Sequence, residues 1–358
     1  MTNFVPENSL TTAFHAPTRI SLRTNPAPIG SSLQPVGDAP FRGETDRTLA
    51  LRQARDDDRG DERSIRPAPG PARRNVEVGL TAPEKVSIST DGTKKYLYRT
   101  SQNHFIESDL HPRRRPGDAL HLVAGGCRMG CRFCATGRQG LQHSLSTNEI
   151  LNQIGSLPER ERLTNVVFMG MGEPLDNLDN LLPALEVLTS AWGFGWSPTR
   201  ITVSTAGVAS RLERFLEATQ VHLAVSLHNP FPHERAEIMP VEKAWPIREV
   251  VEILRRYDFT HQRRVSFEYI VMSGLNDSPR HIRELCRLLD GIKCRINLIR
   301  FHKIPGSPYF SPDDRAMIAF RDALTAKGIH TTIRTSRGED IQAACGLLST
   351  AQNEAAQF

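Results

Sequence analysis

The pattern of apolar and polar positions along this chain changes near residue 120. From there, short apolar runs that read as buried strands are separated by amphipathic segments with a helical period. The runs are LHLV, NVVFM, ITVS, VHLAVS, VSFEYIV, RINLI and HTTIR. Apolar strands that alternate with helices are typical of a parallel sheet covered by helices. Six or seven such units over residues 117–348 predict an α/β fold, a full or partial (β/α) barrel.

The amphipathic segments between these runs are predicted as helices. The segment STNEILNQI begins at Ser146 and carries Glu149 three residues later, the spacing of a capping box. The other predicted helices are LDNLLPALEVL, RLERFLEA, PIREVVEILRRY, SPRHIRELCRLL and DDRAMIAFRDALTAKG.

Residues 85–116 have a different pattern, which predicts a small β extension. VSIST and KYLYRT flank Asp91-Gly92, a hairpin signal, and HFIESDL reads as a third short strand. A basic run follows, from His111 to Arg115, which is typical of a solvated loop.

Residues 1 to about 80 contain nine prolines and no Trp or Tyr. Such a segment buries too little apolar surface to offset its ordering entropy, so we predict a disordered Pro/Arg-rich tail. The tail is either simply solvated or a basic arm that touches RNA, and the pattern favours the first. Residues 349–358 are predicted as a short C-terminal tail.

Composition narrows the class of protein. The chain is 39% hydrophobic and 24% charged, as expected for a globular enzyme with some unstructured chain. No apolar run approaches the ~20 residues of a membrane span, and no secretory signal is recognisable, so we expect a cytoplasmic protein with no membrane partner. A net charge of +5 permits a nucleic-acid partner without requiring one.

Three of the six cysteines lie within eight residues, as C-x-x-x-C-x-x-C at Cys127, Cys131 and Cys134. The loop follows the first apolar run, at the end of a strand where parallel α/β folds place their active sites. Three thiolates can hold three irons of a [4Fe–4S] cluster and leave the fourth iron open. A structural zinc site needs a fourth ligand, and no Cys or His stands at a finger spacing. The pattern favours the cluster over zinc or coincidence.

The remaining cysteines have ordinary interpretations from spacing alone. Cys286 lies in a helical pattern and Cys294 precedes an apolar run, so both read as small core residues. Cys345, in GEDIQAACG, reads in the same way as a small residue of a short helix.

The cysteine loop resembles the radical S-adenosylmethionine (SAM) superfamily, whose open iron binds the amino and carboxylate groups of SAM. From about Ser89 to Leu348 the chain resembles one branch, the RlmN/Cfr RNA methyltransferases, through NVVFMGMGEPLDN, ITVSTAGV, LAVSLHNP, IPGSPY and IRTSRGEDIQAACG in that order. The resemblance implies a partial (β/α) barrel of the radical SAM type. It also implies an RNA substrate, ribosomal or transfer RNA, an electron donor such as flavodoxin or ferredoxin, and a monomer.

The resemblance also implies which residues of this chain contact SAM. In the family, the turn that matches Gly172 and Glu173 meets the amino group of SAM, and the later strand ends contact its carboxylate or ribose. The expected cofactor contacts here are Gly172, Glu173, Ser204, Ser226, Leu227, His228 and His302. His302 stands where the family has an asparagine, and an imidazole can also donate a hydrogen bond.

Two catalytic residues are implied by the resemblance. The cysteine that matches Cys345 receives a methyl group from one SAM, and a 5′-deoxyadenosyl radical from a second SAM removes a hydrogen atom from it. The resulting carbon adds to C2 or C8 of an adenine, which is too weak a nucleophile for direct methyl transfer. The residue that matches Glu107 accepts the ring proton.

This chain departs from the family at two places. The family has a second cysteine seven residues before the first cluster cysteine, where it releases the RNA through a disulfide; the residue here is Leu120. The helical N-terminal domain of the family is not recognisable in residues 1–80. Two other functions therefore stay open: a radical SAM enzyme that modifies a peptide or small molecule, and a non-catalytic cluster protein that binds SAM and RNA.

Overall fold

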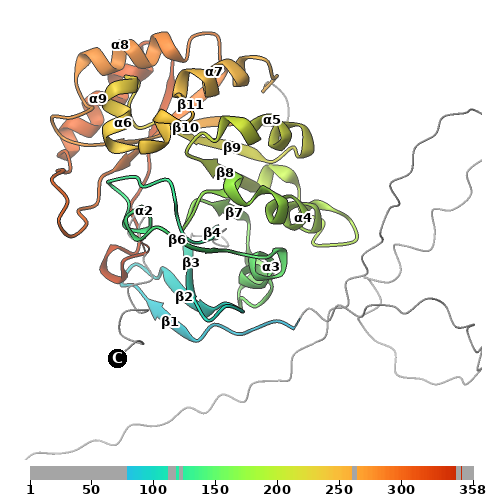
Figure 1. Cartoon of the computed structure of the whole chain (residues 1–358). Coiled ribbons are helices and arrows are strands. Elements are labelled where there is room, and N and C mark those ends of the chain that lie inside the picture. The colour runs from blue at the N-terminus through green and yellow to red at the C-terminus, as the bar shows by residue number, and fades with distance from the viewer. Residues whose placement is uncertain (1–78, 112–117, 121–123, 260–263, 344–347, 349–358) are drawn as a thin grey trace, which may run out of the picture. The chain divides into compact units, whose positions relative to one another are not determined.

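The structure is a computed structural model that describes residues 79–111, 118–120, 124–259, 264–343 and 348 (Figure 1). The predicted N-terminal and C-terminal tails and Cys345 lie outside the described residues. The strands are β1 (Lys85–Ile88), β2 (Lys94–Arg99), β3 (Phe105–His111), β4 (Asp118–Leu120), β5 (Ala124–Gly126), β6 (Leu141–Ser144), β7 (Asn165–Phe168), β8 (Ile201–Thr205), β9 (His222–Ser226), β10 (Val265–Val271), β11 (Cys294–Arg300) and β12 (His330–Ile333). The α-helices are α2 (Ala135–Gln139), α3 (Thr147–Gly155), α4 (Leu178–Thr189), α5 (Ala209–Ala218), α6 (Pro232–Ile238), α7 (Ile247–Arg255), α8 (Pro279–Leu288) and α9 (Asp314–Ala326).

The main sheet has ten described strands in the order β1-β2-β3-β4-β7-β8-β9-β10-β11-β12. From β4 to β12 every neighbouring pair is parallel, and each strand lies beside the next one along the chain. Right-handed connections between sequential parallel strands put all the helices on one side of such a sheet. This is an α/β fold with a parallel sheet, and the predicted partial (β/α) barrel is confirmed.

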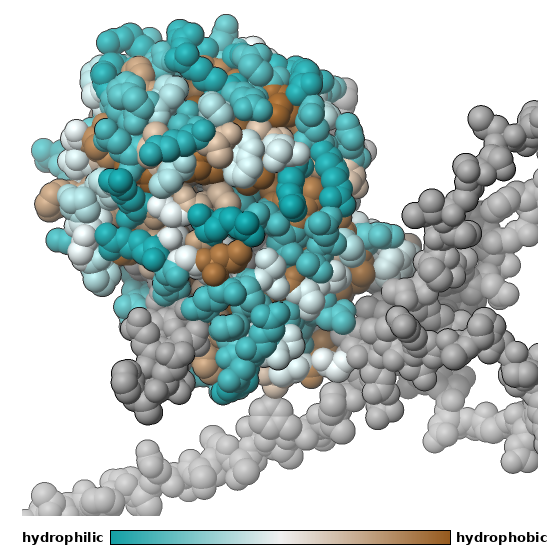
Figure 2. All heavy atoms as spheres, viewed as in Figure 1, coloured by the Kyte–Doolittle hydropathy of each residue, from teal (hydrophilic) through white to brown (hydrophobic). Residues whose placement is uncertain are grey.

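The predicted helices are present on the outer side of this curved sheet, where Figure 1 shows α3, α4, α5, α7 and α8. The capping box is confirmed: Ser146 accepts from the backbone of Glu149, and the Glu149 carboxylate accepts in return from Ser146. The inward faces of the helices and the apolar strands form one buried core. The face drawn in Figure 2 is mostly hydrophilic, with small apolar areas between the polar side chains.

The β extension continues the sheet past β4. β1, β2 and β3 pair in antiparallel fashion, as the hairpin signal at Asp91-Gly92 predicted. The segment after β12 packs against the turn of this hairpin: Ser89 Oγ donates to Asp340 (2.5 Å), and the Gly338 backbone N–H donates to Asp91 (3.0 Å). The last part of the barrel chain therefore lies beside the first part (Figure 1).

Three details differ from the sequence-based expectation. The first parallel strand begins at Asp118, and the only part of LHLV that it contains is Leu120. A small antiparallel hairpin, β5–β6, encloses the cysteine loop. α6 was not predicted because its sequence, PHERAEI, is short and mostly polar. No helix among the described residues is long and apolar enough to cross a membrane.

Candidate functional site

The cysteine loop connects β5 to α2, and close backbone contacts fix its shape. The Cys127 N–H donates to the Gly140 carbonyl (2.9 Å), and the Cys134 N–H donates to the Cys131 carbonyl (3.2 Å). Gly126 has a φ of +99°, and a Cβ there would lie 2.1 Å from the Gly140 oxygen. Only glycine fits this position, so the sequence around the first cysteine is set by the fold of the loop.

A second segment holds the loop from the other side. The Arg132 N–H donates to the carbonyl of Ile238 (2.9 Å), at the end of α6. Met239, the next residue, lines the same cavity as the three cysteines. The segment from α6 to Met239 therefore fixes the position of the cysteine loop relative to the strand ends.

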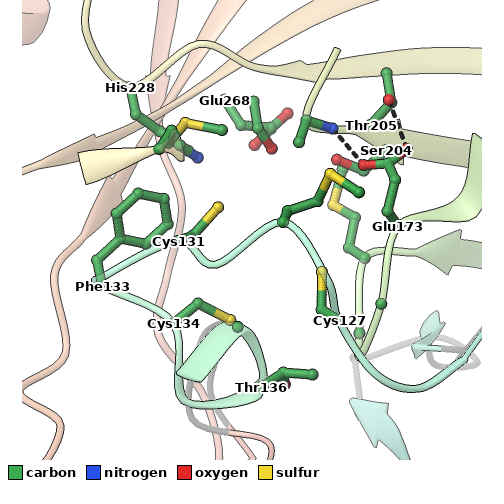
Figure 3. Close-up of a pocket in the computed structure, with 18 of the residues that line it drawn as sticks. Cys127, Cys131, Phe133, Cys134, Thr136, Glu173, Ser204, Thr205, His228 and Glu268 are labelled. Carbon is green, nitrogen blue, oxygen red and sulfur yellow. Dashed lines mark hydrogen bonds between the residues drawn. The ribbon is translucent and has the colours of Figure 1, made fainter. Parts of the chain in front are cut away.

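The thiols of Cys127, Cys131 and Cys134 line one cavity (Figure 3). Burial raises the pKa of all three, that of Cys127 to about 12. As free thiols they stay protonated at neutral pH, and bound metal is what makes them thiolates. Among the described residues, no three His, Cys, Asp or Glu side chains are grouped to hold a single ion. A [4Fe–4S] cluster fits better, because each thiolate binds a different iron.

The cavity encloses about 800 Å³, including space open to solvent, and reaches from the cysteine loop to the carboxyl ends of the parallel strands. This is the position at which (β/α) barrels bind their ligands. Five of the residues expected to contact the cofactor line this cavity. Gly172 and Glu173 follow β7, Ser204 is near the end of β8, and Ser226 and His228 are at and just after the end of β9.

Glu173 is buried, and its carboxylate is fully engaged. It accepts hydrogen bonds from the Thr205 hydroxyl (2.6 Å), the Ala206 N–H (2.6 Å) and the Leu175 N–H (3.0 Å). Burial raises the pKa of Glu173 to about 7, while these three donors act in the opposite direction. The carboxylate joins the end of β7 to the end of β8. A nearby ammonium group would favour its ionised form.

Arg235 of α6 is fully buried and joins the next strand ends. It donates to the carbonyls of Ala206 and Ser226 (2.8 Å each) and of Leu227 (2.9 Å), and forms an ion pair with Glu242. The Leu227 side chain is buried in the core and is not part of the cavity wall. Any contact of Leu227 with a cofactor would have to use its backbone.

His228 lines the cavity with a defined ring orientation (Figure 3). Its Nδ1 accepts from the Ile270 N–H (3.0 Å), and burial lowers the pKa of the ring to about 3. The ring is therefore neutral, and since Nδ1 is the acceptor, the proton is on Nε2. His228 can donate one hydrogen bond to a ligand.

Glu268 is a cavity residue that the sequence reasoning missed. It is in the middle of β10 and accepts from Ser266 Oγ (3.0 Å) and Asn297 Nδ2 (2.7 Å), with Arg334 Nη1 at 3.5 Å. Its side chain lines the cavity and is 2% exposed, so it is a buried carboxylate on the cavity wall. The signal was available, because an acidic residue interrupts the apolar run VSFEYIV.

Besides Leu227, two further expected residues do not line the cavity. Glu107 is buried on β3, where its Oε1 lies 3.1 Å from Lys95 Nζ. His302 forms a hydrogen bond with Ser336 Oγ (3.0 Å) and lies 3.7 Å from Glu339. Their expected roles therefore rest on the sequence alone.

Cys345 lies outside the described residues, but a residue close to it on each side is described. Ala343 is buried beside Gly338, and the Leu348 carbonyl accepts from Thr136 Oγ1 (2.7 Å). Thr136 follows Cys134 by two residues and lines the cavity. The chain thus returns to the cysteine loop three residues after Cys345.

Comparisons with known proteins agree with this site. The family model described as the Radical SAM superfamily matches residues 122–288. The fold and the cysteine loop, with this match, define a radical SAM enzyme, a class that uses a [4Fe–4S] cluster and SAM.

Relatives identify the branch. The chain is 54% identical to the "Probable dual-specificity RNA methyltransferase RlmN" of Bacteroides fragilis over 278 residues, 78% of this chain and 81% of that protein. It is 42% identical to the "Dual-specificity RNA methyltransferase RlmN" of Syntrophus aciditrophicus over 77% and 81% of the two chains. A radical SAM methyltransferase from Sphaerobacter thermophilus superposes with a TM-score of 0.72 at 39% identity, covering 75% of this chain and 81% of that one. The chain belongs to the RlmN family of radical SAM methyltransferases.

Proposed function

We propose that this enzyme methylates a ring carbon, C2 or C8, of an adenosine in ribosomal or transfer RNA. The observation that carries the proposal is the 54–56% identity, over more than three quarters of the chain, to relatives named dual-specificity RNA methyltransferases. The proposal includes a cytoplasmic location, a monomeric enzyme and an electron donor such as flavodoxin or ferredoxin.

The cavity residues have distinct proposed roles. Cys127, Cys131 and Cys134 hold the cluster, and Gly172, Glu173, Ser204, Ser226 and His228 bind SAM at the strand ends. Bound SAM supplies a radical that removes a hydrogen atom from a methyl group. Glu173 orients the strand ends of β7 and β8 around it, and His228 Nε2 donates to a polar group of the ligand. Leu227 contributes backbone only, and His302 acts from outside the described cavity wall.

Cys345 is the proposed carrier of the methyl group, and Glu107 the proposed acceptor of the ring proton. The support for Cys345 is its place between Ala343, which packs by the β1–β2 turn, and Leu348, which bonds to Thr136 beside the cluster loop. The support for Glu107 is its burial and its pairing with Lys95, which favours the ionised form that a base requires.

Mass spectrometry of the purified protein tests the S-methylcysteine route. Protein expressed with iron and SAM available is expected to carry one extra methyl group on Cys345. The Cys127→Ala variant, which cannot hold the cluster, is expected to leave Cys345 unmodified if methyl transfer depends on the cluster. Unmodified Cys345 in cluster-loaded wild-type protein would contradict the route.

A further inference from the structure

One buried carboxyl inside the β extension has no part in the site described so far. β2 and β3 pair so that Lys95 is opposite Asp109 and Leu97 is opposite Glu107. Directly opposed residues of an antiparallel pair project from the same face. Lys95, Glu107 and Asp109 therefore share one face of the hairpin.

The opposite face of this hairpin is the one that meets the helices. Tyr96 and Tyr98, on the alternate positions of β2, form hydrogen bonds to Glu159 (2.8 Å) and Ser156 (3.1 Å) at and just beyond the end of α3. Since α3 covers the outside of the barrel, the face with Lys95 and Asp109 is turned to the inside.

Asp109 is unusual among the described polar residues because it is 1% exposed and neither of its carboxylate oxygens has a hydrogen-bond partner. An ionised carboxylate in this state would cost several kcal/mol in lost hydration. Burial raises the pKa of Asp109 well above its usual range, and the charge of Glu107 raises it further, while Lys95 acts in the opposite direction. Asp109 is therefore a neutral acid that retains its proton.

Its neighbour Glu107 has the reverse environment. The Lys95 ammonium, 3.1 Å from its carboxylate, favours the charged form. Two close carboxyls with one counter-ion hold a single proton between them, and environments that separate their pKa values assign one as acid and one as base.

The position of the pair relative to the chain adds a second observation. Asp109 is the register partner of Leu120 on β4, the position at which the related enzymes keep their second thiol. On the same face, a Cβ on Gly338 would lie 3.3 Å from that of Thr93, two residues before Lys95, and 2.8 Å from that of Ala343. The segment that leads to Cys345 thus packs along the face that carries the pair.

We propose that Asp109 is the proton donor that completes the new methyl group, paired with Glu107 as the base. The proposal rests on the proposed function. Glu107 takes the ring proton after the methylene carbon has added, and the unpaired electron of this adduct leaves to a one-electron acceptor, for which the cluster oxidised during SAM cleavage would serve. A low-molecular-weight thiolate, which replaces the thiol absent at Leu120, then attacks the carrier sulfur. The C–S bond breaks, its electron pair goes to the carbon with the Asp109 proton, and the sulfur forms a mixed disulfide. Glu107 returns its proton to Asp109, so the pair again holds one proton.

A single-turnover experiment tests this step. Cluster-loaded wild type and the Asp109→Asn variant are mixed with SAM, reductant, a small thiol and total RNA from a strain lacking the gene. Asparagine keeps the shape of Asp109 but cannot give up a proton. In the variant we expect 5′-deoxyadenosine within twofold of wild type, RNA–protein adduct accumulating, and methylated RNA released roughly 100-fold more slowly.

Matched variants make the result specific. Asp109→Val, which also lacks the acid and removes a buried unpartnered group, is expected to stall in the same way with no loss of stability. Glu159→Gln removes a carboxyl from the outer side of the same hairpin and is expected to release RNA as wild type does. Release at the wild-type rate by Asp109→Asn or Asp109→Val would overturn the proposal. If wild type forms 5′-deoxyadenosine but no methylated RNA, the proposed function fails, and this inference fails with it.

Discussion

Two buried carboxyls in this molecule, those of Glu173 and Asp109, have opposite hydrogen-bonding environments. Glu173, on the cavity wall, accepts two hydrogen bonds from the end of the next strand and one from the Leu175 N–H, whereas Asp109, inside the β extension, accepts none from the described residues. The first arrangement stabilises the fold and fixes the shape of a ligand site. The second costs stability, and a group retained at such a cost is a candidate for function. The cavity wall is thus prepared to hold a cofactor, and the β extension to move a proton.

The largest effect is expected from a substitution in the cysteine loop, which lies on the same cavity as Glu173. Cys127→Ala leaves two thiolates for the cluster, so we expect loss of bound iron and 5′-deoxyadenosine formation below detection. Iron analysis and chromatography of the reaction measure both. Cys286→Ala, a half-buried cysteine on α8, is the matched control and should retain both properties. Cofactor cleavage by Cys127→Ala would exclude the cluster assignment.

Removal of the Glu173 carboxylate, which accepts three hydrogen bonds, should destabilise the protein. Glu173→Ala leaves the Thr205 hydroxyl and the Ala206 and Leu175 N–H groups without their acceptor in a buried place. We expect a loss of about 3 kcal/mol in the free energy of unfolding, measured with denaturant. Glu173→Gln retains one acceptor oxygen and should lose less. A variant as stable as wild type would show that these hydrogen bonds do not hold the strand ends.

Removal of the Asp109 carboxyl, which has no hydrogen-bond partner among the described residues, should stabilise the protein. Asp109→Val deletes a buried group without partners and places a good strand former on β3, so the free energy of unfolding should rise by about 1 kcal/mol. The same denaturant titration measures it. Destabilisation by this variant would mean that Asp109 is satisfied in solution, and the contrast with Glu173 would disappear.

The pH dependence of stability tests the raised pKa of Glu173. The pKa of Glu173 is raised from 4.5 to about 7 in the folded protein, so the folded state binds more protons than the unfolded state between these values. The contribution of Glu173 to the stability of the cofactor-free protein is therefore present at pH 4.5 and is lost as the pH rises to 7. Glu173→Gln should flatten this slope, and an unchanged slope would contradict the raised pKa.

The sequence predicted the fold well because its signals are local. Apolar runs, a capping box and Asp91-Gly92 each depend on neighbouring residues. The cysteine spacing likewise identified the loop that faces the cavity. Glu268 and Arg235 were missed because their importance comes from strands and a helix that meet only in three dimensions. Leu227 was expected as a cofactor contact because of the family resemblance. Its side chain lies in the core because successive side chains of a strand point to opposite faces.

Asp109 shows the limit of sequence reasoning most clearly. In FIESDL it looks like an exposed polar residue of a short strand. Its burial becomes visible only when β2 and β4 are placed on either side of β3.

The most direct test of the central claim is a comparison of modified nucleosides in ribosomal and transfer RNA. RNA from the parent strain, from a strain lacking the gene, and from that strain complemented with wild type or Cys127→Ala would be digested and analysed by mass spectrometry. We predict that one methyladenosine with the methyl group on C2 or C8 disappears on deletion, returns with wild type and stays absent with Cys127→Ala. Identical methyladenosine profiles in all four strains would contradict an RNA methyltransferase.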